Sequence, residues 1–231
     1  MTPGLANKIA MRGATKICCN FPETLKYLPK DKAVLTGSPI RHELLLGNKP
    51  AGLKLCGFNT SKPIILVVGG STGAVKVNNA VRAILPDLLK KYQIVHLCGK
   101  GKTDASLNGI DGYIQFEYIS DQMRDLFAIS DIVISRAGAN AICELLALRK
   151  PNILIPLSAN ASRGDQILNA NSFKEHGYSS VMTEEEITPE KLIAAVDDLY
   201  KNRQKYIDAM DSSPQSEAVD KIMALIKDCS K

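Results

Sequence analysis

The stretch that decides the fold is Ile64-Ile65-Leu66-Val67-Val68-Gly69-Gly70-Ser71-Thr72-Gly73-Ala74, a short apolar run that breaks into a glycine-rich turn before a helical pattern. The same order recurs at Ile132-Val133-Ile134 followed by Ser135-Arg136-Ala137-Gly138-Ala139. Glycines let the chain turn sharply after a strand and let backbone N–H groups come close to an anion. Two such junctions predict a ligand that carries phosphate, held at the carboxyl ends of parallel strands.

Apolar runs and helical patterns alternate along most of the chain. This order predicts an α/β fold, a Rossmann-like parallel sheet with right-handed crossovers and helices on both faces. Pro86 is expected to kink or interrupt the first of the long helices. We expect strands at 64–68, 93–97, 114–118, 131–134, 152–155 and 179–182, and helices at 74–91, 123–129, 139–148, 165–175, 189–202 and 215–228.

The first 35 residues are expected to be the tail of another α/β domain. They contain a short helix within 5–18, a strand near 15–19 and a second brief strand at 33–36, too little to bury a core alone. Apolar stripes left exposed here and on the last helix predict self-association. The expected organisation is a first-domain remnant at 1–35, a linker at 36–62, a ligand-binding domain at 63–213, and a C-terminal helix at 214–231 that packs back toward the first domain.

Composition narrows the class of protein. The 231 residues are 45% apolar and 23% charged, which are globular values. No secretory leader and no apolar run long enough to cross a bilayer is recognised, so we expect an intracellular protein, at most peripherally attached to a membrane. The absence of Trp and the scarcity of aromatic residues argue against nucleic-acid binding by base stacking.

The cysteines and the uneven charge carry less information. None of the six cysteines has the spacing of a zinc site, so we expect reduced thiols, with Cys98 and Cys143 buried. Residues 1–54 hold nine Lys and Arg against three acidic residues. Such a basic end can face phosphates or an anionic membrane, or it can be an ordinary solvated surface.

The two glycine turns match none of the common phosphate motifs. A dinucleotide site needs Gly-x-Gly-x-x-Gly and an acidic residue after the second strand, whereas here the second strand ends in Leu97-Cys98-Gly99. A P-loop needs Gly-Lys-Ser/Thr, and Lys76 is misplaced for that role. No nucleophile elbow and no cluster of metal ligands is recognised. What remains is a diphosphate held by glycine amides and a helix N-terminus, with Ser71 as a hydroxyl donor.

A carboxylate in the second helix extends this interpretation to a nucleotide. Glu144 follows Ala139 by five residues and lies one turn into the expected helix. There it can accept hydrogen bonds from both hydroxyls of a ribose, while the backbone at Ala139, Asn140 and Ala141 donates to phosphate. On spacing alone, a solvated helix glutamate is equally consistent.

These residues resemble the donor half of the MurG family, bacterial N-acetylglucosaminyltransferases that convert lipid I to lipid II in peptidoglycan synthesis. The likeness rests on both glycine turns, Gly37-Ser38-Pro39-Ile40-Arg41, Glu144, and Asp165-Gln166 with Asn169-Ala170, and it covers essentially the whole chain. It implies the C-terminal half of a GT-B fold, with UDP-GlcNAc as the donor. It further implies inversion at the anomeric carbon without an obligatory metal or other cofactor, in the cytoplasm or at the cytoplasmic face of the cell membrane.

The resemblance also implies roles for individual residues. Arg41 and Ser71 should meet the diphosphate, Ile119 should present its backbone to the uracil, and Gln166 should hydrogen-bond the GlcNAc hydroxyls. The residues implied to bind UDP-GlcNAc are Arg41, Ser71, Ile119, Ala139, Asn140, Ala141, Ile142, Cys143, Glu144 and Gln166, with Met123 and Asp165 as further candidates.

The chain departs from the family where the catalytic base is expected. That base is a histidine in a glycine-rich loop of the first domain, and neither this loop nor the domain's sugar-binding asparagine is present here. His96 is expected as a strand residue and His176 as a helix-end residue, while His42 receives no role from the resemblance. We therefore assign no catalytic residue, and lipid I is expected as an acceptor only with a complete first domain.

Two other functions fit parts of the pattern. One is a non-catalytic UDP-sugar-binding subunit that needs a separate partner with the acceptor domain. The other is a different UDP-GlcNAc enzyme of GT-B architecture, such as a 2-epimerase or a glycolipid synthase. This second alternative would leave the matches at Gly37–Arg41 and Asp165–Gln166 unexplained.

Overall fold

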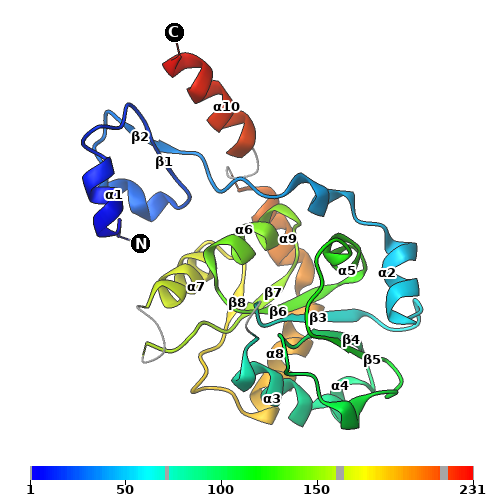
Figure 1. Ribbon diagram of the computed structural model, residues 1–231. Helices are drawn as coiled ribbons and strands as arrows, with labels where there is room; N and C mark the ends of the chain where they lie inside the picture. The colour runs from blue at the N-terminus through cyan, green and yellow to red at the C-terminus, as the bar shows by residue number, and fades with distance from the viewer. Residues whose placement is uncertain (1, 71–72, 160–163, 214–217, 231) are drawn as a thin grey trace. The chain divides into compact units, whose positions relative to one another are not determined.

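The chain forms two compact units, which Figure 1 traces from blue to red. The computed structural model describes residues 2–70, 73–159, 164–213 and 218–230. One unit comprises Met1–Ile40 with Ser212–Lys231, and the larger unit is Arg41–Asp211. Both glycine turns and Arg41, Glu144 and Gln166 belong to the larger unit.

The larger unit is built on a six-stranded parallel sheet with the strand order β5-β4-β3-β6-β7-β8. This confirms the predicted parallel α/β architecture. After β3 the chain first adds β4 and β5 on one side and then crosses to add β6 on the other. Such a reversal of strand order leaves a crevice at the carboxyl ends of β3 and β6. The strands are β3 (Ile64–Val68), β4 (Gln93–Leu97), β5 (Tyr113–Phe116), β6 (Ile132–Ser135), β7 (Asn152–Leu154) and β8 (Ser180–Val181).

Helices cover both faces of this sheet (Figure 1). One face carries α3 (Val75–Ala83), α4 (Leu85–Leu88) and α8 (Pro189–Lys201). The other carries α5 (Met123–Ile129), α6 (Ala139–Ala147) and α7 (Asp165–Glu175). A strand covered on both sides has no solvent-facing positions, which is why β3 and β6 are continuous apolar runs.

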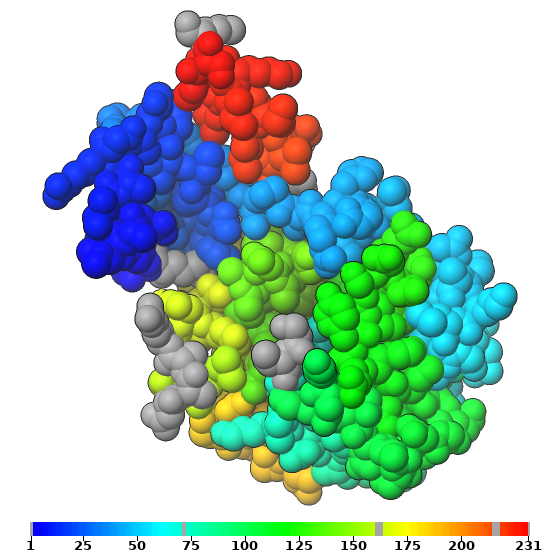
Figure 2. Space-filling model, viewed as in Figure 1, coloured from blue at the N-terminus to red at the C-terminus, as the bar shows by residue number. Residues whose placement is uncertain are grey.

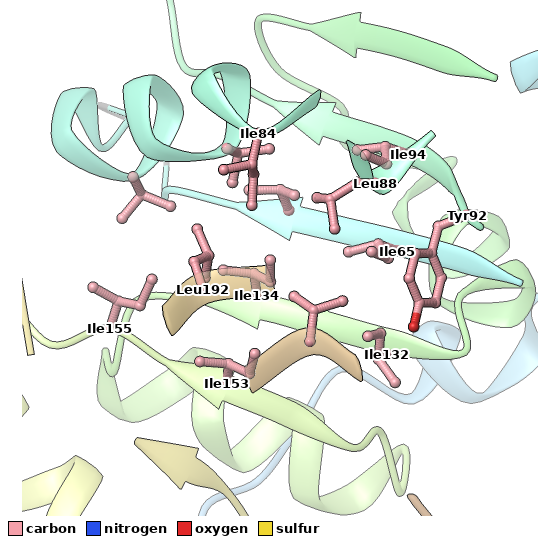
Figure 3. Close-up of a cluster of buried hydrophobic side chains, with 14 of the residues drawn as sticks. Ile65, Ile84, Leu88, Tyr92, Ile94, Ile132, Ile134, Ile153, Ile155 and Leu192 are labelled. Atoms are coloured by element: carbon pink, nitrogen blue, oxygen red, sulfur yellow. The ribbon is translucent and has the colours of Figure 1, made fainter. Parts of the chain in front are cut away.

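The core between the sheet and the first of these helix layers is aliphatic (Figure 3). Alternate strand residues point into it, and helix residues fill the spaces between them. Each side chain buried in this way contributes roughly 1.5–3 kcal/mol of hydrophobic stabilisation. Among its fully or almost fully buried members are Ile65, Ile84, Leu88, Ile94, Ile132, Ile134, Ile153, Ile155 and Leu192.

Pro86 interrupts the helix expected at 74–91, as predicted. The first segment, α3, ends at Ala83, and Ile84 has non-helical dihedral angles, with φ −107° and ψ 6°. Pro86 then lies in the first turn of α4, where its missing N–H group costs no helical hydrogen bond.

Residues 41–56 belong to the larger unit, although 36–62 were expected to be a linker. They form η2 (His42–Leu46) and α2 (Lys49–Cys56), which pack on α5. The backbone N–H of Asn48 donates to the Asp125 carboxylate over 2.7 Å, and a Cβ at Gly52 would overlap the Asp125 carbonyl oxygen. In Figure 2 these residues, light blue and cyan, lie directly against the green ones that include α5.

One helix of the larger unit was not predicted. After α8 the chain passes Asn202 and immediately begins α9 (Arg203–Asp211). Met210 is its single buried residue, so the helix has no apolar stripe that a sequence pattern could reveal.

The smaller unit contains α1 (Leu5–Ala10), β1 (Ile17–Cys19), η1 (Pro22–Tyr27), β2 (Ala33–Leu35) and α10 (Ala218–Cys229). Its two strands pair in parallel. Apolar side chains on both helices are exposed, as expected: Leu5, Ile9, Val219, Met223 and Ile226. Self-association and the packing of residues 214–231 toward a first domain stay predictions.

The thiols follow the expectation from the sequence. None of the six cysteines, all of which lie in the described part of the chain, forms a disulfide, and Cys98 and Cys143 are buried. Within the described residues, no helix has both the length and the apolar character needed to cross a bilayer.

Candidate functional site

The first glycine turn closes the carboxyl end of β3 in a tight backbone loop. Gly70 and Gly73 have φ angles of 82° and 68°, and the Gly73 N–H donates to the Gly70 carbonyl over 2.9 Å. A Cβ at Gly73 would overlap the carbonyl oxygen of Cys98, so a side chain is excluded there for two reasons. Ser71, expected to donate to the diphosphate, lies outside the described residues together with Thr72.

The second turn places the start of α6 beside the first. Gly138 is the N-cap of α6 and offers no side chain to cap the first-turn amides. The N–H groups at Ala139, Asn140 and Ala141 therefore belong to the set that an anion at a helix N-terminus can satisfy. Ile142 and Cys143 point their side chains into the core, so only their backbone could contact a ligand.

The sheet brings these two turns together. β3 and β6 are hydrogen-bonded neighbours, and their last residues, Val68 and Ser135, are register partners. The Arg136 N–H donates to the Val68 carbonyl over 3.4 Å, which ties the second turn to the first strand. Both glycine-rich junctions thus open at one edge of the sheet, as the sequence predicted.

Glu144 and Arg41 form an ion pair at this edge. The Nε and Nη2 atoms of Arg41 each lie 3.3 Å from Oε1 of Glu144. The Glu144 side chain is 19% exposed and that of Arg41 is 49% exposed. Burial raises the pKa of the Glu144 carboxyl, and the nearby Glu43 raises it further, while Arg41 opposes both effects. Glu144 is thus a partly buried, ion-paired carboxylate, and its contact with a ribose stays a prediction.

Packing of η2 explains how Arg41 reaches Glu144 across 103 residues of sequence. Arg41 directly precedes η2, whose Leu44 is 2% exposed. A Cβ at Gly47, just after η2, would overlap the carbonyl oxygen of Arg124 in α5. The segment after Arg41 is therefore held against α5, and this position places the guanidinium beside Glu144 of α6.

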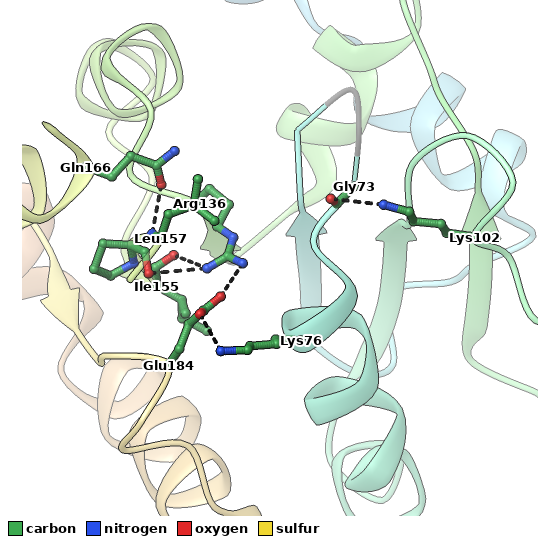
Figure 4. Close-up of polar contacts among 9 residues, drawn as sticks. Gly73, Lys76, Lys102, Arg136, Ile155, Leu157, Gln166 and Glu184 are labelled. Carbon is green, nitrogen blue, oxygen red and sulfur yellow. Dashed lines mark hydrogen bonds and ion pairs between the residues drawn. The ribbon is translucent and has the colours of Figure 1, made fainter. Parts of the chain in front are cut away.

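A buried carboxylate that the sequence analysis missed braces the site from below (Figure 4). Glu184, in the loop after β8, is 3% exposed and binds Nη2 of Arg136 over 2.5 Å and Nζ of Lys76 over 2.9 Å. Burial alone would raise the pKa of Glu184, but the hydrogen bonds from Lys76 and Arg136 hold it below its usual value. The run of three glutamates at 184–186 gave no signal, because charge runs are usually solvated.

Arg136 carries this bracing on to the predicted sugar-binding residue (Figure 4). Its Nη1 donates to the carbonyls of Ile155 and Pro156 over 3.0 and 3.3 Å. The next residue, Leu157, donates its N–H to Oε1 of Gln166 over 3.1 Å. Gln166 lies in the first turn of α7, and the Asn169 amide of that helix donates to the Ala137 carbonyl over 3.0 Å.

The remaining predicted residues, Ile119, Met123 and Asp165, lie on other segments of the larger unit. Ile119 is half-buried in the segment between β5 and α5. Met123 is 8% exposed at the start of α5, so its side chain belongs to the core. Asp165 is exposed at the first position of α7. Their predicted contacts with a ligand stay predictions.

His96 and His176 contribute no reactive group at this edge, whereas His42 directly follows Arg41 and is exposed. His96 is fully buried on β4, with Nδ1 3.0 Å from the Tyr113 hydroxyl and Nε2 3.1 Å from Oδ1 of Asn78. Burial, together with the charge of Arg82, lowers the pKa of His96 to about 3. His176 ends α7, as expected, with Nδ1 2.8 Å from the Ser172 carbonyl oxygen. Among the described residues, no cluster of His, Cys, Asp and Glu could hold a metal ion.

The chain was compared with known proteins. Residues 64–226 match the model of the glycosyltransferase family 28 C-terminal domain. The chain belongs to glycosyltransferase family 28. The matched region contains both glycine turns, Glu144, Gln166 and the Arg136–Glu184 pair, whereas Arg41 precedes it.

Among the family 28 relatives, the N-acetylglucosamine transferase of Lachnospira eligens is 78% identical over all 231 residues. Its name specifies UDP-N-acetylglucosamine and N-acetylmuramyl-(pentapeptide) pyrophosphoryl-undecaprenol. A protein of the same name from Lachnoclostridium phytofermentans is 63% identical over 99% of the chain. The chain spans 65% and 64% of the lengths of these two relatives.

Solved structures agree on the fold of this family 28 chain. MurG of Acinetobacter baumannii superposes on 98% of the chain with a TM-score of 0.69 and 22% identity, and 64% of that protein is covered. The glycosyltransferase of kitacinnamycin covers 92% with a TM-score of 0.70 and 17% identity, over 54% of its own length. At these identities the likeness concerns the fold, the C-terminal half of a GT-B glycosyltransferase.

Proposed function

We propose that this chain supplies the UDP-GlcNAc-binding half of an inverting N-acetylglucosaminyltransferase that converts lipid I to lipid II. The observation that carries the proposal is the Arg41–Glu144 pair beside two neighbouring glycine turns. A nucleoside diphosphate presents ribose hydroxyls next to a doubly charged phosphate group. The Glu144 carboxylate can accept from the ribose hydroxyls, and the adjoining Arg41 guanidinium and helix-end amides can donate to the phosphates.

The roles follow from the chemistry of each group. Glu144 accepts hydrogen bonds from the ribose hydroxyls, and Arg41 leaves Glu144 to pair with the diphosphate. The first-turn amides of α6, from Ala139 to Ala141, donate to the same phosphates. When the sugar is transferred, the departing UDP gains negative charge. Arg41 and these amides then stabilise the transition state electrostatically.

Gln166 is assigned to the sugar with a defined polarity. Its Oε1 is occupied by the Leu157 N–H, so Nε2 is the atom that remains to meet the GlcNAc. A primary amide nitrogen only donates, and a sugar hydroxyl oxygen accepts. Arg136 and Glu184 act as positioning residues, because they fix the loop that sets the rotation of this amide.

The acceptor side and the general base are assigned outside these 231 residues. The chain covers 65% of the Lachnospira eligens relative, and His96 and His176 both lie away from the groups assembled at the two turns. We place the enzyme at the cytoplasmic face of the cell membrane, where the undecaprenol-linked acceptor would be reached.

Calorimetric titration tests the nucleotide site. UDP and inorganic pyrophosphate are titrated into the wild-type chain, Glu144→Ala and Glu43→Ala, the last a matched loss of a neighbouring carboxylate. We expect Glu144→Ala to weaken UDP by about 100-fold or more, the value of two charge-assisted hydrogen bonds, and pyrophosphate less than threefold. Glu43→Ala should change neither. Absence of UDP binding to the wild type at millimolar concentration would refute the proposal, and equal losses for both ligands would remove the ribose assignment.

A further inference from the structure

A lysine from the neighbouring strand reaches the first glycine turn (Figure 4). Lys102 lies in the loop after β4, and its Nζ is 3.4 Å from the carbonyl oxygen of Gly73. Neither the motifs nor the family resemblance singled out this residue. It brings a positive charge to the turn that was expected to contact a diphosphate.

The backbone of Lys102 is fixed by the helix that follows the same turn. Arg82 of α3 donates through Nη2 to the Lys102 carbonyl over 2.6 Å, and the Lys102 N–H donates to the Gly99 carbonyl over 3.1 Å. Asn78, one turn earlier on α3, donates its amide to the Cys98 carbonyl over 2.8 Å. The helix thus holds the β4 loop against the glycine turn, and the approach of Gly73 to Cys98 is the point of contact.

The sheet order places this lysine opposite Arg41. β3 lies between β4 and β6, so the turn after β3 has one neighbouring loop on each side. Lys102 comes from the β4 side, whereas Arg41 and Glu144 meet on the β6 side. A dianion seated on the first turn would have a cation on each flank.

We propose that Lys102 is a second diphosphate-binding cation, which exchanges the Gly73 carbonyl for a phosphate oxygen when a nucleoside diphosphate binds; this rests on the proposed nucleotide site. A carbonyl is a neutral acceptor, whereas a phosphate oxygen is negatively charged, so the exchange gives the ammonium group an opposite charge as its partner. Lysine serves this purpose as a point charge on a flexible stem, so a short swing of Nζ is enough. The held backbone limits the ordering cost of that swing.

The same contact could instead only stabilise the turn, and a titration separates the two roles. UDP and uridine are titrated into the wild type, Lys102→Gln, Lys102→Arg and Lys100→Gln. Lys100 is exposed in the same loop, two residues away, and provides a matched loss of charge. We expect Lys102→Gln to weaken UDP about tenfold, Lys102→Arg to recover most of that loss, and Lys100→Gln to lose less than twofold. Uridine, which has no phosphate, should bind all four proteins alike.

Each outcome has one meaning. If wild-type chain binds no UDP, the nucleotide site itself is refuted, independently of Lys102. If wild type binds UDP and Lys102→Gln matches it within twofold, the lysine proposal is overturned. It is also overturned if uridine weakens by the same factor as UDP, which would indicate a collapsed turn, or if Lys100→Gln loses as much as Lys102→Gln.

Discussion

The two sides of β3 use polar residues in opposite ways at its carboxyl end. On the β4 side, His96 is 0% exposed and lies between the Asn78 amide and the Tyr113 hydroxyl. On the β6 side, Arg41 and Glu144 form an ion pair that solvent reaches, with 49% and 19% of their side chains exposed. One group is closed and neutral, and the other is open and charged.

The side chains of the closed group hydrogen-bond to one another and to the backbone. Oδ1 of Asn78 can only accept, so Nε2 of His96 carries the proton and Nδ1 accepts from the Tyr113 hydroxyl. The Asn78 amide nitrogen is used by the Cys98 carbonyl. Each of these side chains is buried with a polar partner, whereas Glu144 and Arg41 are reached by solvent and can exchange each other for a ligand. The buried group around His96 therefore stabilises the turn, whereas the Arg41–Glu144 pair is open to a ligand.

The largest effect is expected at Gly73, where the turn after β3 meets the end of β4. Gly73→Ala would strain a φ of 68° and would push a methyl group into the Cys98 carbonyl, so we expect a loss of about 3 kcal/mol or more of unfolding free energy. Gly101→Ala is the matched control, because φ is 67° and nothing lies within 4 Å of its Cβ position. It should cost only about 1 kcal/mol in urea unfolding. An equal loss of unfolding free energy in the two variants would mean that Gly73 does not approach the Cys98 carbonyl closely.

Acid should lower the unfolding free energy through His96, the buried histidine of the closed group. The pKa of His96 is lowered to about 3 in the folded protein, while an unfolded histidine titrates near 6.5. The unfolded chain therefore takes up the proton first, and stability falls as the pH drops from 6.5 toward 3. Between pH 7 and pH 4.5 this amounts to about 3 kcal/mol. His96→Gln should flatten that part of the pH profile in urea unfolding, and an unchanged slope would show that carboxylates alone cause it.

Glu184 tests the support beneath the open side. Glu184→Gln leaves Arg136, which is 11% exposed, without a counter-charge, and we expect a loss of about 2 kcal/mol of unfolding free energy. Asp87→Asn breaks the exposed pair with Lys90 and should cost less than about 0.5 kcal/mol. Because Arg136 also holds the loop that orients Gln166, Glu184→Gln should weaken UDP-GlcNAc more than UDP in calorimetry. Equal weakening would confine Glu184 to stability.

Local patterns in the sequence predicted the sheet and both turns. The apolar runs at β3 and β6 are continuous because both faces of these strands are buried. The glycines that follow each run indicate a sharp turn. Pro86 marked its own helix break because its ring acts on the residues beside it. In each case the cause lies within a few residues of the effect.

Features that depend on distant partners were missed. Glu184 matters because it meets Lys76 and Arg136, which are 108 and 48 residues away. Lys102 matters because the β4 loop folds over Gly73, and residues 41–56 join the larger unit because Leu44 and Gly52 fit against α5. No pattern within the segments themselves records these contacts. The resemblance to MurG supplied Arg41 and Gln166 only as correspondences, without the atoms that they touch.

The smallest effect on stability is expected at Glu144 itself. Burial raises the pKa of its carboxyl, so the charged form is disfavoured, and this group's contribution to stability declines as the pH rises through that raised pKa. Glu144→Gln removes the disfavoured charge and loses a half-exposed ion pair, two changes of opposite sign. We expect the unfolding free energy at pH 7 to change by less than about 0.5 kcal/mol, and UDP affinity to fall severalfold in calorimetry. Substitution of a residue that serves only packing would instead lower the unfolding free energy and leave UDP affinity unchanged. If Glu144→Gln unfolds the protein as readily as Glu184→Gln, the two sides of β3 do not differ as argued, and the open pair is structural.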